Sequence, residues 1–200
     1  MLGQLLIIGY FLTYLFESKN AWIVIAVLSI MVFTASWIAL RTTKSYRKVF
    51  YLKALCSIVF GGGINLLIVT QGVLQIEPWY SPRFLIPLAG MIFAGSMNSV
   101  SIAAERIENE MKRNMPYIEA RGIALKACLI PIVNSLFAVG LVSLPGMMTG
   151  QILSGISPLI AARYQIMVMC MLFASAGISS ACFMALIKSD LEKLHLEMNN

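Results

Sequence analysis

The pattern of hydrophobic and polar positions along the chain predicts a series of long apolar helices. Runs of predominantly apolar residues recur between shorter polar or basic breaks, and they have the length of about 20 residues that an α-helix needs to cross a bilayer. We therefore expect an all-α, polytopic transmembrane helical bundle of about six spans, forming a single domain over residues 1–200. The six predicted spans cover approximately residues 1–16, 21–40, 50–74, 84–103, 124–144 and 160–187.

The composition supports this prediction and restricts the chemistry of the chain. Hydrophobic residues make up 59% of the sequence and charged residues 12%, against about 25% charged residues in soluble domains. The sequence has no G-x-x-x-x-G-K-[ST] phosphate loop, and no nucleophile–base pair or metal-ligand cluster can be assembled from it. We therefore expect a protein that is not an enzyme. Its four cysteines stand singly in apolar runs, which favours small buried hydrophobic side chains over ligands or disulfides.

Lysine and arginine are distributed unevenly among the predicted loops. Twelve of the fifteen lie in the loops 41–53 and 104–126 or in the C-terminal tail. Because loops rich in Lys and Arg stay in the cytoplasm, this bias predicts cytoplasmic termini in a multi-pass protein of the cell (plasma or inner) membrane. It also explains the net charge of +6 without nucleic-acid binding. The segments expected outside are residues 17–20, 75–83 and 150–158.

The polar groups inside the predicted spans are uncharged. Ion-coupled carriers usually need an ionisable residue at bilayer depth, but no Asp, Glu, Lys or Arg lies near the middle of any predicted span. Any uphill transport would therefore take its energy from another subunit. The amides Asn65, Asn98 and Asn134 can form interhelical hydrogen bonds worth about 0.6 kcal/mol each, or Asn98 and Asn134 can be polar neighbours of a transport path.

One polar stretch, "LVSLPGMMTGQILSG" at residues 141–155, interrupts the apolar pattern. Pro145 lacks the N–H that continues a helix and Gly146 adds backbone freedom, so the pattern predicts a helix break at this point. Irregular backbone near membrane depth is tolerated where it is buried in protein or lines a wet cavity, and such breaks often mark binding sites in transporters. The alternative is an ordinary outside loop made of turn residues.

Four segments of the chain resemble a known family. The block "GLVSLPGMMTGQILSGISPLIAARYQIMVM" (140–169) is similar to the signature of the FetB-type iron-export ABC transporter permeases, to which plant aluminium-tolerance half-transporter permeases are related. Residues 3–16, 86–107 and 127–135 match in the same order, and the similarity covers approximately residues 1–188. In that family a further hydrophobic span and a basic connector precede the segment that matches residues 3–16, and the cytoplasmic loop is several residues longer.

The resemblance implies a permease subunit that exports a metal such as iron and forms a homodimer. Its ATP-binding cassette partner would bind and hydrolyse ATP, so no cofactor is expected on this chain. Thioether sulfur suits soft ions such as Cu(I) better than hard Fe(III), so the methionines themselves do not indicate iron. The residues expected to form the substrate path are Ser143, Pro145, Gly146, Met147, Met148 and Gln151, with Asn98 and Asn134 beside them.

The loop 104–126 is the candidate coupling segment between this chain and an ATPase. Ile107, Met111 and Met115 recur at helical spacing, while Glu108 and Lys112 pair at i, i+4 on another face. A short amphipathic helix of this kind can occupy a groove of the ATPase, or it can rest on lipid headgroups.

Two other functional classes remain open at the level of sequence. One is a non-transporting membrane scaffold or assembly subunit, in which glycines and amides only pack helices. The other is a facilitator that works without ATP. Co-purification of an ATPase subunit separates the permease from both alternatives, and substrate flux without that subunit identifies the facilitator.

Overall fold

Helices account for nearly all of the regular structure in the computed structural model, which describes residues 2–17, 20–43, 47–113 and 115–198. The fold class predicted from the apolar pattern is thereby confirmed. The helices are α1 (Leu2–Glu17), α2 (Ala21–Ala39), α3 (Arg47–Leu67), its π-helical continuation η1 (Ile68–Val73), α4 (Pro82–Met111), α5 (Tyr117–Ala138), α6 (Gly146–Leu153) and α7 (Pro158–Met198).

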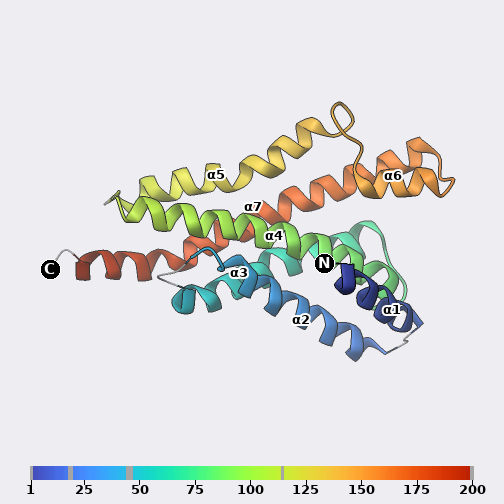
Figure 1. The fold of residues 1–200 in the computed structure, drawn as a ribbon, viewed down its shortest axis with the longest axis horizontal. Helices are drawn as coiled ribbons and strands as arrows, with labels where there is room; N and C mark the ends of the chain where they lie inside the picture. Colours follow the sequence, from blue (N-terminus) through green and yellow to red (C-terminus); the bar gives the residue numbers. More distant parts are fainter. Residues whose placement is uncertain (1, 18–19, 44–46, 114, 199–200) are drawn as a thin grey trace.

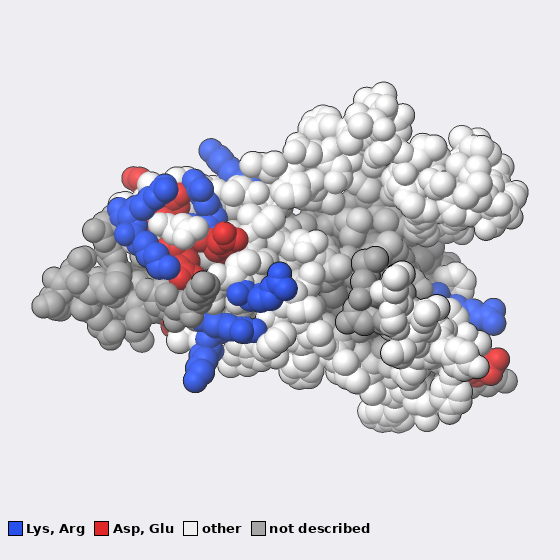
Figure 2. All heavy atoms as spheres, in the orientation of Figure 1, with Lys and Arg blue, Asp and Glu red and all other residues white. Residues whose placement is uncertain are grey.

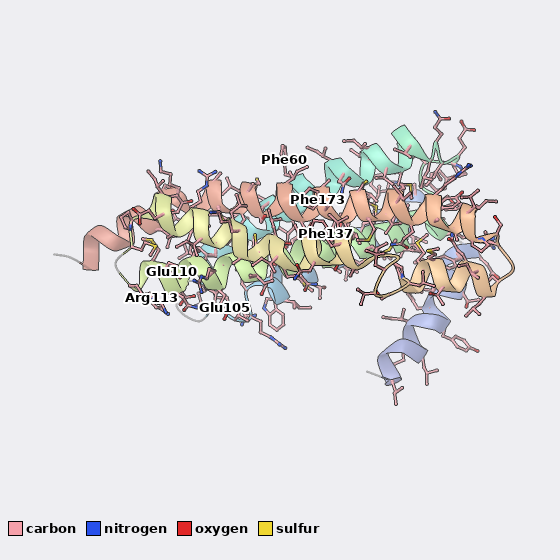
Figure 3. The ribbon with its side chains drawn as sticks, turned by 90° about the horizontal axis from the view of Figure 1, so that it is seen from above. Phe60, Glu105, Glu110, Arg113, Phe137 and Phe173 are labelled. Atoms are coloured by element: carbon pink, nitrogen blue, oxygen red, sulfur yellow. The ribbon has the colours of Figure 1, made fainter. Side chains whose placement is uncertain are left out.

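Five helices run roughly along the long axis of the molecule, namely α2, α3, α4, α5 and α7 (Figure 1). Within the described residues these are the five that are long and apolar enough to cross a membrane. They correspond to the second to sixth predicted spans. The first predicted span corresponds to α1, which has 16 residues and projects from the side of the bundle near the end that carries α6 (Figures 1 and 3). Among the described side chains of α1, Leu15 alone is buried.

The bundle packs around α7, which touches α3, α4, α5 and α6. Small residues allow the closest approach, because Gly61 of α3 lies directly against Ser179 of α7. The Ser179 hydroxyl donates a hydrogen bond to Oγ of Ser96 on α4 at 3.0 Å. Asn65 donates its side-chain N–H to the backbone carbonyl of Met171 at 2.5 Å. This amide therefore joins α3 to α7 by an interhelical hydrogen bond, as one of the two interpretations of the asparagines predicted.

The candidate coupling segment is not a separate short helix. Helix α4 continues through it to Met111, and α5 begins at Tyr117, because i, i+4 ion pairs support the helix beyond its apolar part. These pairs join Arg106 to Glu110 at 2.8 Å and Lys112 to Glu108 at 2.7 Å.

The apolar stripe of this segment faces the interior of the chain itself. Ile107 is fully buried, Met111 is 6% exposed, and the partly buried Met115 packs against the same core. Glu108 is also buried. The expected exposed apolar face is therefore not present in this conformation, and Lys112 is the exposed member of the predicted set.

Charged side chains lie at the two ends of the bundle and leave a largely uncharged band between them (Figure 2). At the end where α4 meets α5, the exposed basic residues include Arg106, Lys112, Arg113 and Arg121. We refer to this as the basic end. Arg83 lies in the first turn of α4 and Arg163 in the second turn of α7, at the opposite end. Lys19, Lys44 and the side chain of Lys193 lie outside the described residues. The charge distribution is the one expected for a bundle that spans a bilayer.

Cysteine labelling would test the predicted orientation. On a background without the four native cysteines, a membrane-impermeant maleimide added to intact cells should modify Glu77→Cys but not Arg121→Cys, because the basic end is expected in the cytoplasm. Both positions are exposed in the structure. Permeabilised cells should label both variants, which controls for reactivity. Labelling of Arg121→Cys alone in intact cells would reverse the orientation.

Candidate substrate cavity

Helix α5 ends earlier than the apolar pattern predicts. The expected span reaches residue 144, but the helix stops at Ala138, and the chain turns through Gly140, whose φ of +80° favours glycine. The carbonyl of Ala138 accepts the N–H groups of Leu141, Val142 and Ser143 at 3.2, 2.8 and 3.3 Å. The turn therefore pairs the last carbonyl of the helix within the chain itself.

Pro145 and Gly146 begin a helix, which corrects the prediction that they break the fifth span. Pro145 is the N-cap of α6, and Gly146 is its first residue. Proline is tolerated at a helix start because no intrahelical acceptor exists there for its missing N–H. Its carbonyl accepts the Thr149 N–H at 2.9 Å and the Thr149 hydroxyl at 3.1 Å. The stretch for which an outside loop was the alternative therefore contains a short helix, α6, packed along the start of α7 (Figure 1).

A hollow of about 640 Å³ lies between α4, α6 and α7. We refer to it as the outer hollow. Glu77 and Arg83, both exposed, stand at its rim. Three thioethers from three helices line it, since Met91 belongs to α4, Met147 to α6 and Met167 to α7. Helix α6 therefore covers a cavity to which distant parts of the chain contribute.

A second hollow, the middle hollow, adjoins the first and has a volume of about 390 Å³. Met91 and Met147 line both hollows, so the two share a wall. The remaining lining of the middle hollow is partly polar and comes from α5, the turn after it, α6 and α7. It includes Ser135, Ser143, Pro145, Gly146, Gln165 and Met169.

A third hollow of about 320 Å³, the inner hollow, follows between α4, α5 and α7. It shares Met91 and Ser135 with the middle hollow and includes Asn98. Toward the basic end the space between the same helices is filled by buried side chains, among them Ile107, Ala124 and Phe183. The three hollows therefore occupy the half of the bundle away from the basic end, and packed side chains close the other half.

Two buried amide oxygens in this region have no hydrogen-bond partner in the structure. Gln165 on α7 is 4% exposed, and its Oε1 is unpaired. Gln151 on α6 lines the outer hollow, and its buried Oε1 is unpaired as well. A buried polar group without a partner typically costs about 1–3 kcal/mol. Such a cost is a common feature of positions that meet a ligand or water.

The predicted path residues occupy different places. Ser143, Pro145, Gly146 and Met147 line the middle hollow, Gln151 and Met147 line the outer hollow, and Asn98 lines the inner one. Met148 lines a fourth hollow of about 300 Å³, which shares Gln165 and Met169 with the middle hollow. Asn134 is exposed on α5 and lines none of these hollows.

Sequence reasoning missed several lining residues, namely Met91, Gln165, Met167 and Met169. A signal for two of them was present, because Gln165 and Met169 in the run "QIMVM" are spaced i, i+4 and therefore share a face of a helix. No comparable signal marked Met91. Across the described residues, no group of three or more His, Cys, Asp or Glu side chains is arranged to hold a metal ion, so the hollows offer mainly neutral donors.

The fold and the cavity define a multi-pass, all-α membrane protein. Comparison with known proteins identifies its family. The chain belongs to the uncharacterised protein family UPF0014, whose model matches residues 1–191. It is 35% identical to the UPF0014 membrane protein slr1647 of Synechocystis, over 98% of this chain and 81% of the relative. No solved structure matches the chain.

Two further relatives carry functional names. The chain is 34% identical to the "Probable iron export permease protein FetB" of Escherichia coli, over 90% of this chain and 75% of the relative. It is 33% identical to the protein ALUMINUM SENSITIVE 3 of Arabidopsis thaliana, over 88% of this chain and 69% of the relative. The family resemblance stated from the sequence motifs is therefore confirmed.

Proposed function

We propose that this chain is the membrane-spanning permease subunit of an ABC transporter that exports a metal ion, with ATP hydrolysed by a separate subunit. The observation that carries the proposal is the series of three adjoining hollows, which begins beside Glu77 and Arg83 and ends at packed side chains toward the basic end. A transporter alternates between states that open on either side, and a path closed at one end fits one such state.

The name of the Escherichia coli relative supports a metal, iron, as the exported substrate. The absence of a phosphate loop from the sequence supports a separate ATPase subunit. The described spans also carry no ion pair in the region of the hollows that would couple transport to an ion gradient. We further propose that two permease chains assemble with the ATPase, as the resemblance implies.

The surface that would dock an ATPase must be exposed at the basic end. Ile107 and Met111 are buried in the chain's own core, so direct docking through them would require α4 to move. Ile118, in the first turn of α5, is 79% exposed among Arg113, Glu119 and Arg121. An exposed apolar side chain within a charged rim is a common feature of protein interfaces. We therefore propose the α4–α5 turn with Ile118 as the docking surface.

Co-purification would test this proposal. A tagged chain expressed with phosphate-loop ATPases of its own genome should retain one of them in detergent, and Ile118→Asp should abolish that retention because it places a charge in an apolar contact. Val49→Asp, which changes another exposed apolar residue, on α3, should not. Loss of retention in both variants would argue against the α4–α5 turn.

Metal content separates the permease from the two alternative functions. Cells that express the chain with its ATPase should accumulate less metal than cells with the chain alone, and an ATPase variant that cannot hydrolyse ATP should remove the difference. Equal efflux without the ATPase would indicate a facilitator. An ATPase that binds without any change in metal content would indicate a scaffold.

A further inference from the structure

The outer and middle hollows combine donors of one chemical kind. Met91, Met147 and Met167 line the outer hollow from three different helices, and Met169 lines the middle one. Thioether sulfur is a soft, uncharged donor, which binds Cu(I)-type ions in preference to hard ions. Methionine is also a common gap-filling residue in apolar cores, so the cluster needs a second observation before it indicates a ligand.

The unpaired amide of Gln165 is that observation. Gln165 is only 4% exposed, and it lines the middle hollow. Its Oε1 has no hydrogen-bond partner. If this side chain served only to fill the apolar core, leucine at this position would make the protein more stable, because a buried oxygen without a hydrogen-bond partner is destabilising. A polar atom kept at such a cost in the same hollow as Met91, Met147 and Met169 is a donor available to a bound cation.

The charge balance of the cavity restricts the ion further. Glu77 and Arg83 at the rim carry opposite charges, and the other lining side chains of the outer and middle hollows are neutral. The cost of removing an ion from water rises with the square of its charge, and neutral donors do not offset a second or third positive charge. Divalent iron and trivalent ions would need carboxylates, whereas a monovalent ion would not.

We propose that Met91, Met147 and Met169, together with the amide oxygen of Gln165, all of which line the middle hollow, bind a soft monovalent metal ion of the Cu(I) or Ag(I) class. The proposal rests on the proposed metal transport for its biological meaning, but the binding itself requires only this chain. It names a class of ion different from that in the name of the Escherichia coli relative.

Metal binding to the purified full chain in detergent would test the site. Ag(I) is the probe, because it is redox-inert and monovalent, and Fe(II) under anaerobic conditions is the comparison. Ag(I) should bind saturably and Fe(II) should not. Because loss of even an outer-shell partner typically costs about 10–100-fold in metal affinity, Met91→Leu/Met147→Leu/Met169→Leu should weaken Ag(I) binding by at least about 100-fold.

A matched control separates the site from the methionine content of the protein. Met31→Leu/Met97→Leu/Met171→Leu replaces three methionines of α2, α4 and α7 that do not line the outer or middle hollow, and it should retain Ag(I) binding. Gln165→Leu should weaken binding while leaving the thermal midpoint unchanged or higher, which a purely structural glutamine would not do. Equal Ag(I) binding by both triple variants, or preference for Fe(II) in the parent, would overturn the site.

The outcomes also separate this inference from the proposed function. If an ATPase is retained and metal efflux requires ATP but the chain does not bind Ag(I), the transport proposal stands and the thioether site is wrong. If the chain binds Ag(I) through these methionines but neither retains an ATPase nor changes cellular metal, the site stands and the transport proposal is wrong.

Discussion

Replacing Gly61 by alanine should strongly reduce the membrane abundance and the thermal stability of the protein. A methyl group at this position would lie 2.5 Å from Oγ and 2.8 Å from the backbone nitrogen of Ser179. The backbone of α7 cannot yield without moving the helix around which the bundle packs. Overpacking of this kind typically costs about 1–3 kcal/mol, and more where backbone must shift.

Gly63→Ala is the matched control for this prediction. It changes the same helix by the same methyl group, but nothing lies within 4 Å of the added carbon. Alanine is also the better helix former by about 1 kcal/mol, so this variant should be neutral or slightly stabilised. Fluorescence-detected size-exclusion chromatography after heating would compare the two. Equal stability of both variants would show that α3 and α7 do not approach each other closely at Gly61.

Removing both arginines around Glu110 is expected to destabilise the basic end of the bundle. Glu110 has a side chain 2% exposed, and its Oε1 lies 2.8 Å from Arg106 and 3.6 Å from Arg113. No well-directed hydrogen bond reaches this oxygen, so the ion pairs are its main compensation. Breaking a buried pair costs about 3–5 kcal/mol, but both arginines are largely in solvent, so we expect about 1–2 kcal/mol for Arg106→Ala/Arg113→Ala.

A control with the same change in charge isolates the buried carboxylate. Arg121→Ala/Lys126→Ala removes two exposed cations of α5 that form no ion pair among the described residues, and it should unfold like the parent. Adding Glu110→Leu to the destabilised variant should recover stability, because the uncompensated charge is then gone. Thermal unfolding in detergent measures all three. Failure of Glu110→Leu to rescue would mean that Glu110 is not the cause.

The apolar pattern predicted where the spans lie but not where the helices end. The predicted span 21–40 matches α2, Ala21–Ala39, almost residue for residue. Helix α4 extends to Met111, eight residues beyond the predicted span 84–103, because hydropathy reports lipid contact while the helix continues on i, i+4 ion pairs in water. The sequence did show one of these pairs, Glu108 with Lys112, but the apolar pattern gave no reason to extend the span to include it.

The break after the fifth span shows a different limit. Sequence reasoning placed it at Pro145, since proline is the obvious helix breaker, but Pro87 and Pro131 lie inside α4 and α5. Within a membrane bundle, neighbouring helices can satisfy the carbonyl that proline frees. The actual end of α5 is the turn at Gly140, which a single glycine among apolar residues did not reveal.

The candidate cavity was predicted only in part for a similar reason. Met147 and Gln151 belong to a conspicuous polar stretch, so the sequence identified them. Met91 stands inside an apolar run of α4, where it is indistinguishable from a packing residue. Its position beside Met147 depends on how α4, α6 and α7 cross, which is a property of the packed bundle and not of any local pattern.

Helix α7 has 41 residues and is therefore about 60 Å long at 1.5 Å per residue. A hydrocarbon core is about 30 Å thick, so roughly half of α7 lies beyond it, and its terminal turns extend past the basic end (Figure 1), with the tip about 30 Å from the midpoint of the helix. A rigid rod of this kind magnifies small tilts. If α7 leaned by about 10° within the bilayer, its tip, about 30 Å further on, would swing sideways by about 5 Å. Because Gln165 and Met169 both belong to α7, a change in how they contact a bound ion would displace the far end of the helix.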